Sequence, residues 1–320
     1  MNNIELTINN GSNIMLPVVE EGIVWETARR GSPGKLTFTV IKDEKLDFQE
    51  GNEVRLKIGG QNVFCGYVFI KKRSKEGLIN VTAYDQLRYL KNKDTYVYEN
   101  KTASEFIKMV AADFRLNTGT IEETGFKIAS RTEDNKTLFD MFQNALDLTL
   151  ENKKKMYVFY DNFGKLTLKN IESMKLNILL DEETGENFEY TSSIDSNTYN
   201  QVKLSYDNDK TSKREIYIVY DSNNINNWGL LQYFETIQES TNGKAKADAL
   251  LSLYNRKTRN LSMKNVFGNI YVRGGSMLVV KLNLDDIKVM NYMIVDSVKH
   301  TFKEGEHFMD LRLIGGEFVA

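Results

Sequence analysis

The two histidines of this chain lie close together, at His300 and His307 in the stretch VKHTFKEGEHFMDLRL. An imidazole nitrogen can bind zinc or exchange a proton near neutral pH, so a close pair suggests a metal site or a catalytic acid and base. A zinc site needs three or four ligands, and the chain offers no further histidine and a single cysteine, Cys65. Carboxylates would have to complete such a site, and nothing in the spacing places one.

The element that positions both histidines is a predicted β-hairpin. A two-residue turn at Glu304–Gly305 connects two segments that alternate apolar and polar residues. This turn implies three cross-strand pairs: Lys303 with Glu306, Phe302 with His307, and His300 with Met309. Both histidines then lie on one face of the sheet as diagonal neighbours, about 7–8 Å apart. We interpret the pair as part of a hairpin rather than as a metal or catalytic site.

Three further motifs could carry chemistry, and each has a structural interpretation. Cys65 lies in an apolar strand and is predicted to be a small core residue. The GSPGK stretch, Gly31–Lys35, has only two residues between its glycines, whereas a phosphate-binding P-loop has four and continues with Ser or Thr. We therefore predict a hairpin turn there. The DNFG stretch, Asp161–Gly164, lacks the companion motifs of a kinase and is predicted to be a hairpin tip.

No catalytic constellation emerges from these candidates. His300 would have to serve as the base of any Ser or Cys triad, and the sequence places no partner beside it. The carboxylate pairs that glycosidases use are defined by their separation in space, which the sequence does not show. We therefore assign no catalytic, cofactor-binding or metal-binding residue, expect no cofactor, and predict that the chain is not an enzyme.

Composition and charge limit the classes of protein to which the chain can belong. Its 320 residues contain 42 Lys and Arg against 44 Asp and Glu, a balance that does not suit a nucleic-acid-binding protein. No run approaches the ~20 apolar residues of a membrane helix, and the N-terminus MNNIELTINN has no signal-peptide character. We expect a protein that is made in the cytoplasm and stays soluble, with two or three closely packed domains.

The chain alternates between β-rich ends and an α+β middle. Thr102 and Glu105 have capping-box spacing and begin a helix, and a second helix begins near Thr137. Strands return from about Tyr190, interrupted by a helix at about 244–254. In the first ninety residues, three segments between glycine turns have the alternation of strands in a small barrel or sandwich: Glu53–Ile58, Asn62–Lys72 and Leu78–Tyr84.

The final strands resemble the early ones in order and spacing. EGNEVRLKI aligns with GGSMLVVKL, and the following stretch FIKKRSKEGLINV aligns with SVKHTFKEGEHFM. Under this alignment His300 corresponds to Lys72 and His307 to Ile79, so the same hairpin is built without either histidine. The pattern suggests the hypothesis of a duplicated barrel.

Longer stretches of the chain resemble a known family. They are INVTAYDQLRYLKNKDTYVYENKTASEFIKMVAADF (Ile79–Phe114), SSIDSNTYNQVKL (Ser192–Leu204), NNWGLLQYFE (Asn226–Glu235) and HTFKEGEHFMDLRLIGGEF (His300–Phe318). In their order and extent they look like the XkdQ-like branch of phage tail baseplate hub proteins. That branch occurs in contractile-tailed phages, defective prophages and phage-tail-like bacteriocins. The resemblance covers nearly the whole chain.

The resemblance implies a mainly β fold with α+β, made of two tube-like β-barrel domains and a smaller α+β domain. We expect the first barrel at 1–93, the α+β middle domain at 94–190, and the second barrel at 191–320 with an inserted helix around 244–254. Three subunits would then present six similar barrels in a pseudo-hexameric ring, which joins the six-fold tail tube to the three-fold spike. The implied function is that of a structural baseplate hub.

The resemblance also implies the partners. They are two further copies of the chain, the tail tube protein, a spike or needle protein and other baseplate proteins, with a LysM-containing tail protein and the tape measure protein as further candidates. No membrane is involved, and nucleic acid is only passing cargo if the particle carries DNA. The chain is expected to assemble from the bacterial cytoplasm into the baseplate of the virion or tail-like particle. Two alternative functions stay open: a tail-associated peptidoglycan hydrolase and a carbohydrate-binding protein acting at the host surface.

Overall fold

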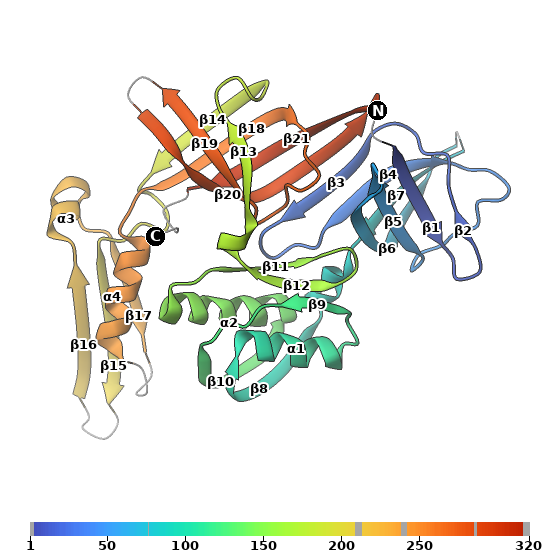
Figure 1. Cartoon of the computed structure of the whole chain (residues 1–320). Helices are drawn as coiled ribbons and strands as arrows, with labels where there is room; N and C mark the ends of the chain where they lie inside the picture. Colours follow the sequence, from blue (N-terminus) through green and yellow to red (C-terminus); the bar gives the residue numbers. More distant parts are fainter. Residues whose placement is uncertain (1–2, 76, 209–212, 238–241, 285–286, 316–320) are drawn as a thin grey trace.

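The computed structural model describes residues 3–75, 77–208, 213–237, 242–284 and 287–315. The chain is mainly β, with 53% strand and 19% helix. Figure 1 shows four parts, which we call the first lobe, the middle unit, the second lobe and the outer unit. The predicted fold class, mainly β with an α+β part, is confirmed. Within the described residues the long sheet does not close into a barrel.

The first lobe is a sheet that covers one hydrophobic core. Its strands are β1 (Ile4–Asn9), β2 (Ile14–Met15), β3 (Ile23–Ala28), β4 (Lys35–Ile41), β5 (Glu53–Ile58), β6 (Gln61–Arg73) and β7 (Leu78–Tyr84). They lie in the order β3-β4-β7-β6-β5-β1-β2. Alternate residues of each strand are buried, as Leu36, Phe38 and Val40 are in β4, because only one face of the sheet contacts the core.

The middle unit packs two helices against short strands. Its elements are η1 (Gln86–Lys91), β8 (Lys93–Thr102), α1 (Ala103–Asp113), β9 (Thr118–Ile121), β10 (Lys127–Thr137), α2 (Leu138–Lys153), β11 (Tyr157–Asp161), β12 (Leu166–Asn170) and η2 (Ile171–Met174). The predicted capping box is confirmed: Thr102 Oγ1 accepts the Glu105 N–H at 3.2 Å, and the Glu105 carboxylate accepts the Thr102 N–H at 2.8 Å. The second predicted helix is α2, which Thr137 caps.

The second lobe is the other part of the same sheet and has its own core. Its strands are β13 (Lys175–Leu180), β14 (Asn187–Ser193), β18 (Thr258–Phe267), β19 (Met277–Leu284), β20 (Ile287–Lys303) and β21 (Glu306–Ile314). β13 and most of β14 precede residue 191, yet they pair with β19 and β18. This lobe therefore takes strands from the range that we expected in the middle domain, because apolar side chains such as Leu180 join its core.

The outer unit is inserted between β14 and β18. It contains β15 (Gln201–Asn208), β16 (Lys213–Tyr220), α3 (Ser222–Trp228), β17 (Gln232–Thr236) and α4 (Gly243–Tyr254). Val202 and Leu204 of β15 share a separate core with Ala247 and Leu250 of α4. The helix expected around 244–254 is α4, and the strands beside it form their own sheet, β16-β15-β17, rather than extending the second lobe.

The two lobes repeat one arrangement. The order β3-β4-β7-β6-β5-β1 corresponds to β14-β18-β21-β20-β19-β13, and the matching strands follow each other in the same sequence along the chain. The internal repeat predicted from the sequence is therefore present in the strand order. One difference is direction, since β1 is antiparallel to β5 whereas β13 is parallel to β19. The outer unit takes the place of the short loop 29–34 between β3 and β4.

The hairpin registers correct the sequence alignment of the repeat by one residue. Val81 and Met309, which the alignment matches, pair with Lys71 and His300 respectively. His300 therefore corresponds to Lys71, and the predicted match to Lys72 is wrong. The reason is the turn, since four residues join β6 to β7 whereas two join β20 to β21.

Candidate functional site at the junction of the lobes

The two lobes are joined edge to edge at strands β3 and β20. Six cross-strand pairs connect them, from Ser297 with Ala28 to Phe302 with Ile23. β20 carries β21 on one edge, and on its other edge it carries first β19 and then β3. One sheet therefore runs through both lobes without a break, as Figure 1 shows. We call this region the lobe junction.

His300 lies at the centre of the lobe junction, on the core side of the sheet. The predicted hairpin register is confirmed in all three pairs: Lys303 with Glu306, Phe302 with His307, and His300 with Met309. Glu304 and Gly305 form the turn, with positive φ angles of 56° and 76°. His300 is fully buried, and its ring stacks on Trp25 of β3 with 4.5 Å between the ring centres. The hairpin histidine thus packs one lobe against the other.

The two histidine rings are hydrogen-bonded to each other. His300 Nδ1 lies 2.9 Å from His307 Nε2, and His300 Nε2 lies 2.9 Å from the carbonyl oxygen of Val272. A carbonyl oxygen can only accept, so Nε2 of His300 carries the proton and Nδ1 accepts the Nε2–H of His307. The pKa of His300 is lowered to about 3, mainly by burial and secondly by the neighbouring His307. Burial also lowers the pKa of His307, to about 4. Both rings are neutral near neutral pH, and neither nitrogen of His300 is left to bind a metal or take a proton.

Cys65 is buried in β6, as predicted for a core residue. Burial, followed by the charge of Glu53, raises the pKa of its thiol to about 12. The thiol is therefore protonated near neutral pH, which removes the thiolate that a nucleophile or a metal ligand needs. In the part of the chain that the structure describes, no three His, Cys, Asp or Glu side chains group closely enough to hold a metal ion.

A buried polar cluster lies where the first lobe, the middle unit and the second lobe meet. It contains Asp85 just before η1, Asp161 at the end of β11, and Arg273 from the loop before β19. Arg273 Nη2 donates to the carbonyl oxygen of Asp161 at 2.6 Å, and the guanidinium lies 4.0 Å from the centre of the Tyr160 ring. Gln86 Nε2 donates to the Asp161 carboxylate at 2.9 Å. The cluster holds three parts of the chain together.

Burial governs the protonation of this cluster. It raises the pKa of Asp85 well above its usual value, with the charge of Asp161 as the second cause, and it lowers the pKa of Arg273. The backbone N–H groups of Gly34 and Leu87 donate to the Asp85 carboxylate at 2.9 and 3.0 Å, which offsets part of the cost of burial. No pattern in the sequence pointed to Asp85 or Arg273, because each comes from a different part of the chain and neither belongs to a recognisable motif.

The two glycine motifs have structural roles here. The GSPGK stretch lies between the antiparallel strands β3 and β4, as predicted, and a Cβ at Gly34 would lie 2.3 Å from an oxygen of Asp85. The glycine thus makes room for a carboxylate of the same chain rather than for a phosphate. The DNFG stretch is the tip of the β11–β12 hairpin, also as predicted, and the Gly164 N–H donates to the Asp161 carboxylate at 2.7 Å.

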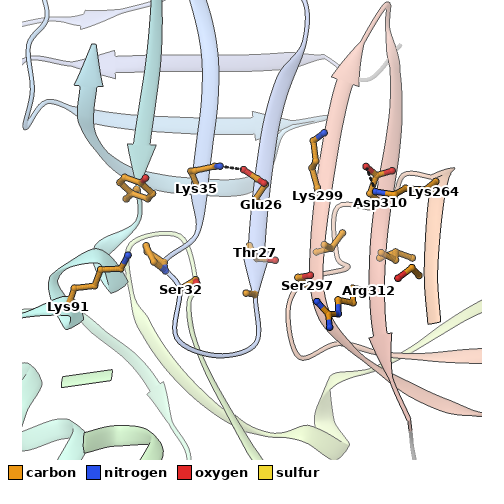
Figure 2. A pocket seen from close by; sticks show the side chains of 16 residues that line it. Glu26, Thr27, Ser32, Lys35, Lys91, Lys264, Ser297, Lys299, Asp310 and Arg312 are labelled. Carbon is orange, nitrogen blue, oxygen red and sulfur yellow. Dashed lines mark hydrogen bonds and ion pairs between the residues drawn. The ribbon is translucent and has the colours of Figure 1, made fainter. Parts of the chain in front are cut away.

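A polar groove crosses the lobe junction on the face of the sheet opposite to the hydrophobic cores. It has a volume of about 550 Å³. Figure 2 shows Lys35 paired with Glu26 on the first lobe, and Lys264 paired with Asp310 on the second. The lining holds five basic side chains against two acidic ones. These charged residues are Lys35, Lys91, Lys264, Lys299, Arg312, Glu26 and Asp310.

Comparison with known proteins places the chain in a family. A protein-family model described as YqbQ-like matches residues 23–314, which is most of the chain. The chain belongs to the YqbQ-like family. Two proteins of Bacillus subtilis (strain 168) are similar over 309 residues, 93% of this chain and 93% of each of them: the uncharacterized protein YqbQ, 31% identical, and XkdQ of the phage-like element PBSX, 29% identical. The resemblance to the XkdQ-like branch is confirmed.

The fold of this YqbQ-like chain matches that of a solved tail protein. The 43 kDa tail protein of prophage MuSo2 from Shewanella oneidensis is similar with a TM-score of 0.72 and 12% identity, over 99% of this chain and 100% of that one. At this identity the likeness is one of fold. The described residues include no helix that is long and apolar enough to span a membrane.

Proposed function

We propose that this YqbQ-like chain is the structural baseplate hub of a contractile phage tail or tail-like particle. Three copies form a ring in which the six lobes act as tube-like barrel domains, and the ring joins the six-fold tail tube to the three-fold spike. The observation that carries the proposal is the duplicated lobe. One chain holds two copies of one strand arrangement, joined edge to edge at β3 and β20.

A symmetry argument supports this function. The β3–β20 contact joins non-equivalent strands of two similar lobes, so it is a head-to-tail contact. Head-to-tail contacts that repeat around an axis close into rings. In a ring of three chains, the two lobes of each chain differ in detail, so the ring has three-fold symmetry. All six lobes share one strand arrangement, so the ring also has nearly six-fold symmetry. Such a ring matches a spike on one side and a tube on the other.

The polar groove supports a channel through the ring. The hydrophobic cores cover one face of the continuous sheet, which leaves the polar face to line a water-filled space. The excess of basic side chains in the groove favours acidic cargo. In a particle that carries DNA, the passing nucleic acid would be such a cargo, and the tape measure protein is the other proposed occupant.

The proposed neighbours are the tail tube protein on one side of the ring and the spike or needle protein on the other. Other baseplate proteins and a LysM-containing tail protein are further proposed contacts. The chain has no catalytic role in this proposal. The histidines His300 and His307 are buried and neutral, and the thiol of Cys65 is protonated. We therefore assign structural roles to the histidine pair and to Cys65.

The test is the absolute mass of the purified chain by light scattering, over a concentration series that reaches high micromolar, with negative-stain images of the same samples. We expect a species of three subunits that appears as a ring, either alone or after addition of the cognate spike or tube protein. A mass of one subunit under all these conditions would contradict the hub. Clearing of cell walls in a zymogram would favour the peptidoglycan hydrolase instead.

A further inference from the structure

The long strand β6 has an open edge where its counterpart β20 has a partner. β20 pairs with β19 up to Ile294, and further along the same edge it pairs with β3 from Ser297 to Phe302. β6 pairs with β5 up to Tyr67, and β7 lies on its opposite edge. In the described chain no strand pairs with the β5 side of β6 from residue 69 to residue 73. The first lobe therefore lacks the strand that β3 supplies to the second lobe.

The strand β14 has the complementary open edge. Its counterpart β3 lies between β4 and β20, whereas β14 pairs with β18 on one edge and ends the described sheet on the other. The registers match the two strands residue by residue, since Trp25 and Glu26 of β3 correspond to Phe188 and Glu189 of β14. An open strand edge exposes unpaired N–H and C=O groups and is a template for pairing. Each chain thus carries one open edge on β6 and one open edge on β14.

We infer that β14 of one copy pairs with the open edge of β6 in the next copy, in the register that joins β3 to β20 within the chain. The inference rests on the proposed function and names the strands that would close its ring. Transferring the register through the repeat gives three specific pairs. They are Ile70 with Glu189, Lys71 with Phe188, and Arg73 with Glu186.

The chemistry of the two edges fits this pairing. The β6 edge carries consecutive basic residues at Lys71, Lys72 and Arg73, whereas Glu186 and Glu189 flank the start of β14. Arg73 would lie opposite Glu186, and opposite charges across antiparallel strands stabilise their pairing. Lys71 already donates to the carbonyl oxygen of Phe48 and lies 4.3 Å from the centre of the Phe48 ring. The pairing would place Phe188 of the next copy beside Lys71, in the place where Trp25 stacks on His300 within the chain.

The β6 edge also carries an exposed apolar side chain. The Ile70 side chain is 50% exposed on the polar face of the sheet, and in the inferred pairing it lies beside the aliphatic part of Glu189. Because the contact joins two different edges, each copy receives one strand and donates one. A closed ring then leaves neither edge unpaired, whereas an open chain of copies would leave one at each end.

The first test is a crosslink between the paired positions. Directly opposed residues have Cβ atoms about 4.5–5.5 Å apart, so a short bismaleimide can join cysteines placed there. The variant Ile70→Cys/Glu189→Cys is expected to give covalent dimers and trimers, and each single variant is expected to give none. The control Thr39→Cys/Glu189→Cys places the first cysteine on the same face of the interior strand β4 and should not crosslink.

The second test reverses the charges of one pair. Arg73→Glu places like charges opposite each other and should shift trimer formation to a several-fold higher concentration. Arg73→Glu/Glu186→Arg restores opposite charges and should return the midpoint toward that of the unmodified chain. Both side chains are exposed in the described structure, so neither change disturbs a core. Recovery in the double variant separates a direct pair from a general loss of stability.

The outcomes separate this inference from the proposed function. A sample that light scattering shows to contain three subunits, but that gives no Ile70→Cys/Glu189→Cys crosslink, would overturn the pairing and leave the ring. Dimers formed by Ile70→Cys alone would mean that the β6 edge meets itself, which also overturns the pairing. A single-subunit mass without crosslinks, even with the spike and tube proteins present, would overturn both.

Discussion

At the scale of residues, two buried polar groups join separate parts of the chain. The His300–His307 pair packs under the lobe junction against Trp25, and Arg273 ties the second lobe to the middle unit through Asp161. Both groups consist of residue types that often carry chemistry. Their burial and their hydrogen bonds turn them into structural groups, because a desolvated ring or carboxyl that already has its partners has little capacity left for a substrate.

The histidine pair predicts a stability that depends on pH. An unfolded histidine has a pKa of about 6.5, whereas that of His300 in the fold is about 3. Between these values the unfolded state binds more protons, so stability is complete above about pH 6.5 and falls toward pH 3, by up to about 1.4 kcal/mol per pH unit. The variant His300→Phe should lose stability more gradually from pH 7 to pH 5 in urea unfolding. Equal slopes for the two proteins would contradict the assignment.

Arg273 predicts a large loss of stability on substitution. The variant Arg273→Met removes the guanidinium from its buried partners, and breaking a buried charged group costs about 3–5 kcal/mol. The control Lys244→Met breaks an exposed ion pair with Asp248 at 3.2 Å, which should cost less than about 1 kcal/mol. Denaturant unfolding of both variants measures the difference. A similar small cost for both would show that the cluster does not join the units.

At the scale of elements, the β20–β21 hairpin carries the lobe junction, and its turn is not optimal. Glu304 adopts a positive φ of 56°, which is strained for most side chains, whereas Asn tolerates it and Asn-Gly is the preferred pair for such a turn. We expect Glu304→Asn to raise the free energy of unfolding by up to about 1 kcal/mol. The control Glu306→Asn, at the first residue of β21, should bring no gain. Equal effects would contradict the turn geometry.

At the scale of the whole molecule, the outer unit is an insertion with its own core. Its two connections leave the second lobe at Ser193 and Thr258, which are cross-strand partners in β14 and β18. Val202, Leu204 and Leu250 belong to the core of the outer unit and not to that of the second lobe. The second lobe is therefore complete without this unit.

Excision of the outer unit should leave a folded protein. We expect a chain in which residues 194–257 are replaced by Asn-Gly to unfold cooperatively, because a two-residue turn connects strands that are already paired. Circular dichroism and thermal unfolding would measure this. As a control, the same replacement in an Arg273→Met background shows whether these measurements detect a chain that a second change has destabilised. Loss of cooperative unfolding after the excision alone would mean that the unit supports the second lobe.

Local patterns in the sequence determined the elements and several turns. Alternation predicted β5, β6 and β7, the Thr102–Glu105 spacing predicted the start of α1, and the Glu304–Gly305 turn predicted a hairpin register that the structure confirms pair by pair. The match between early and late strands predicted the repeat. These features depend on neighbouring residues along the chain or on one hairpin, so the sequence alone contains the physical information.

Only the tertiary structure decided which distant residues meet. It pairs β13 and β14 with the second lobe, separates the outer unit, and brings Asp85, Asp161 and Arg273 together from three parts of the chain. It also shows that β3 completes the open edge of β20. Such contacts depend on which strand edges and apolar faces remain uncovered once each part has folded, and spacing along one sequence does not encode that choice locally.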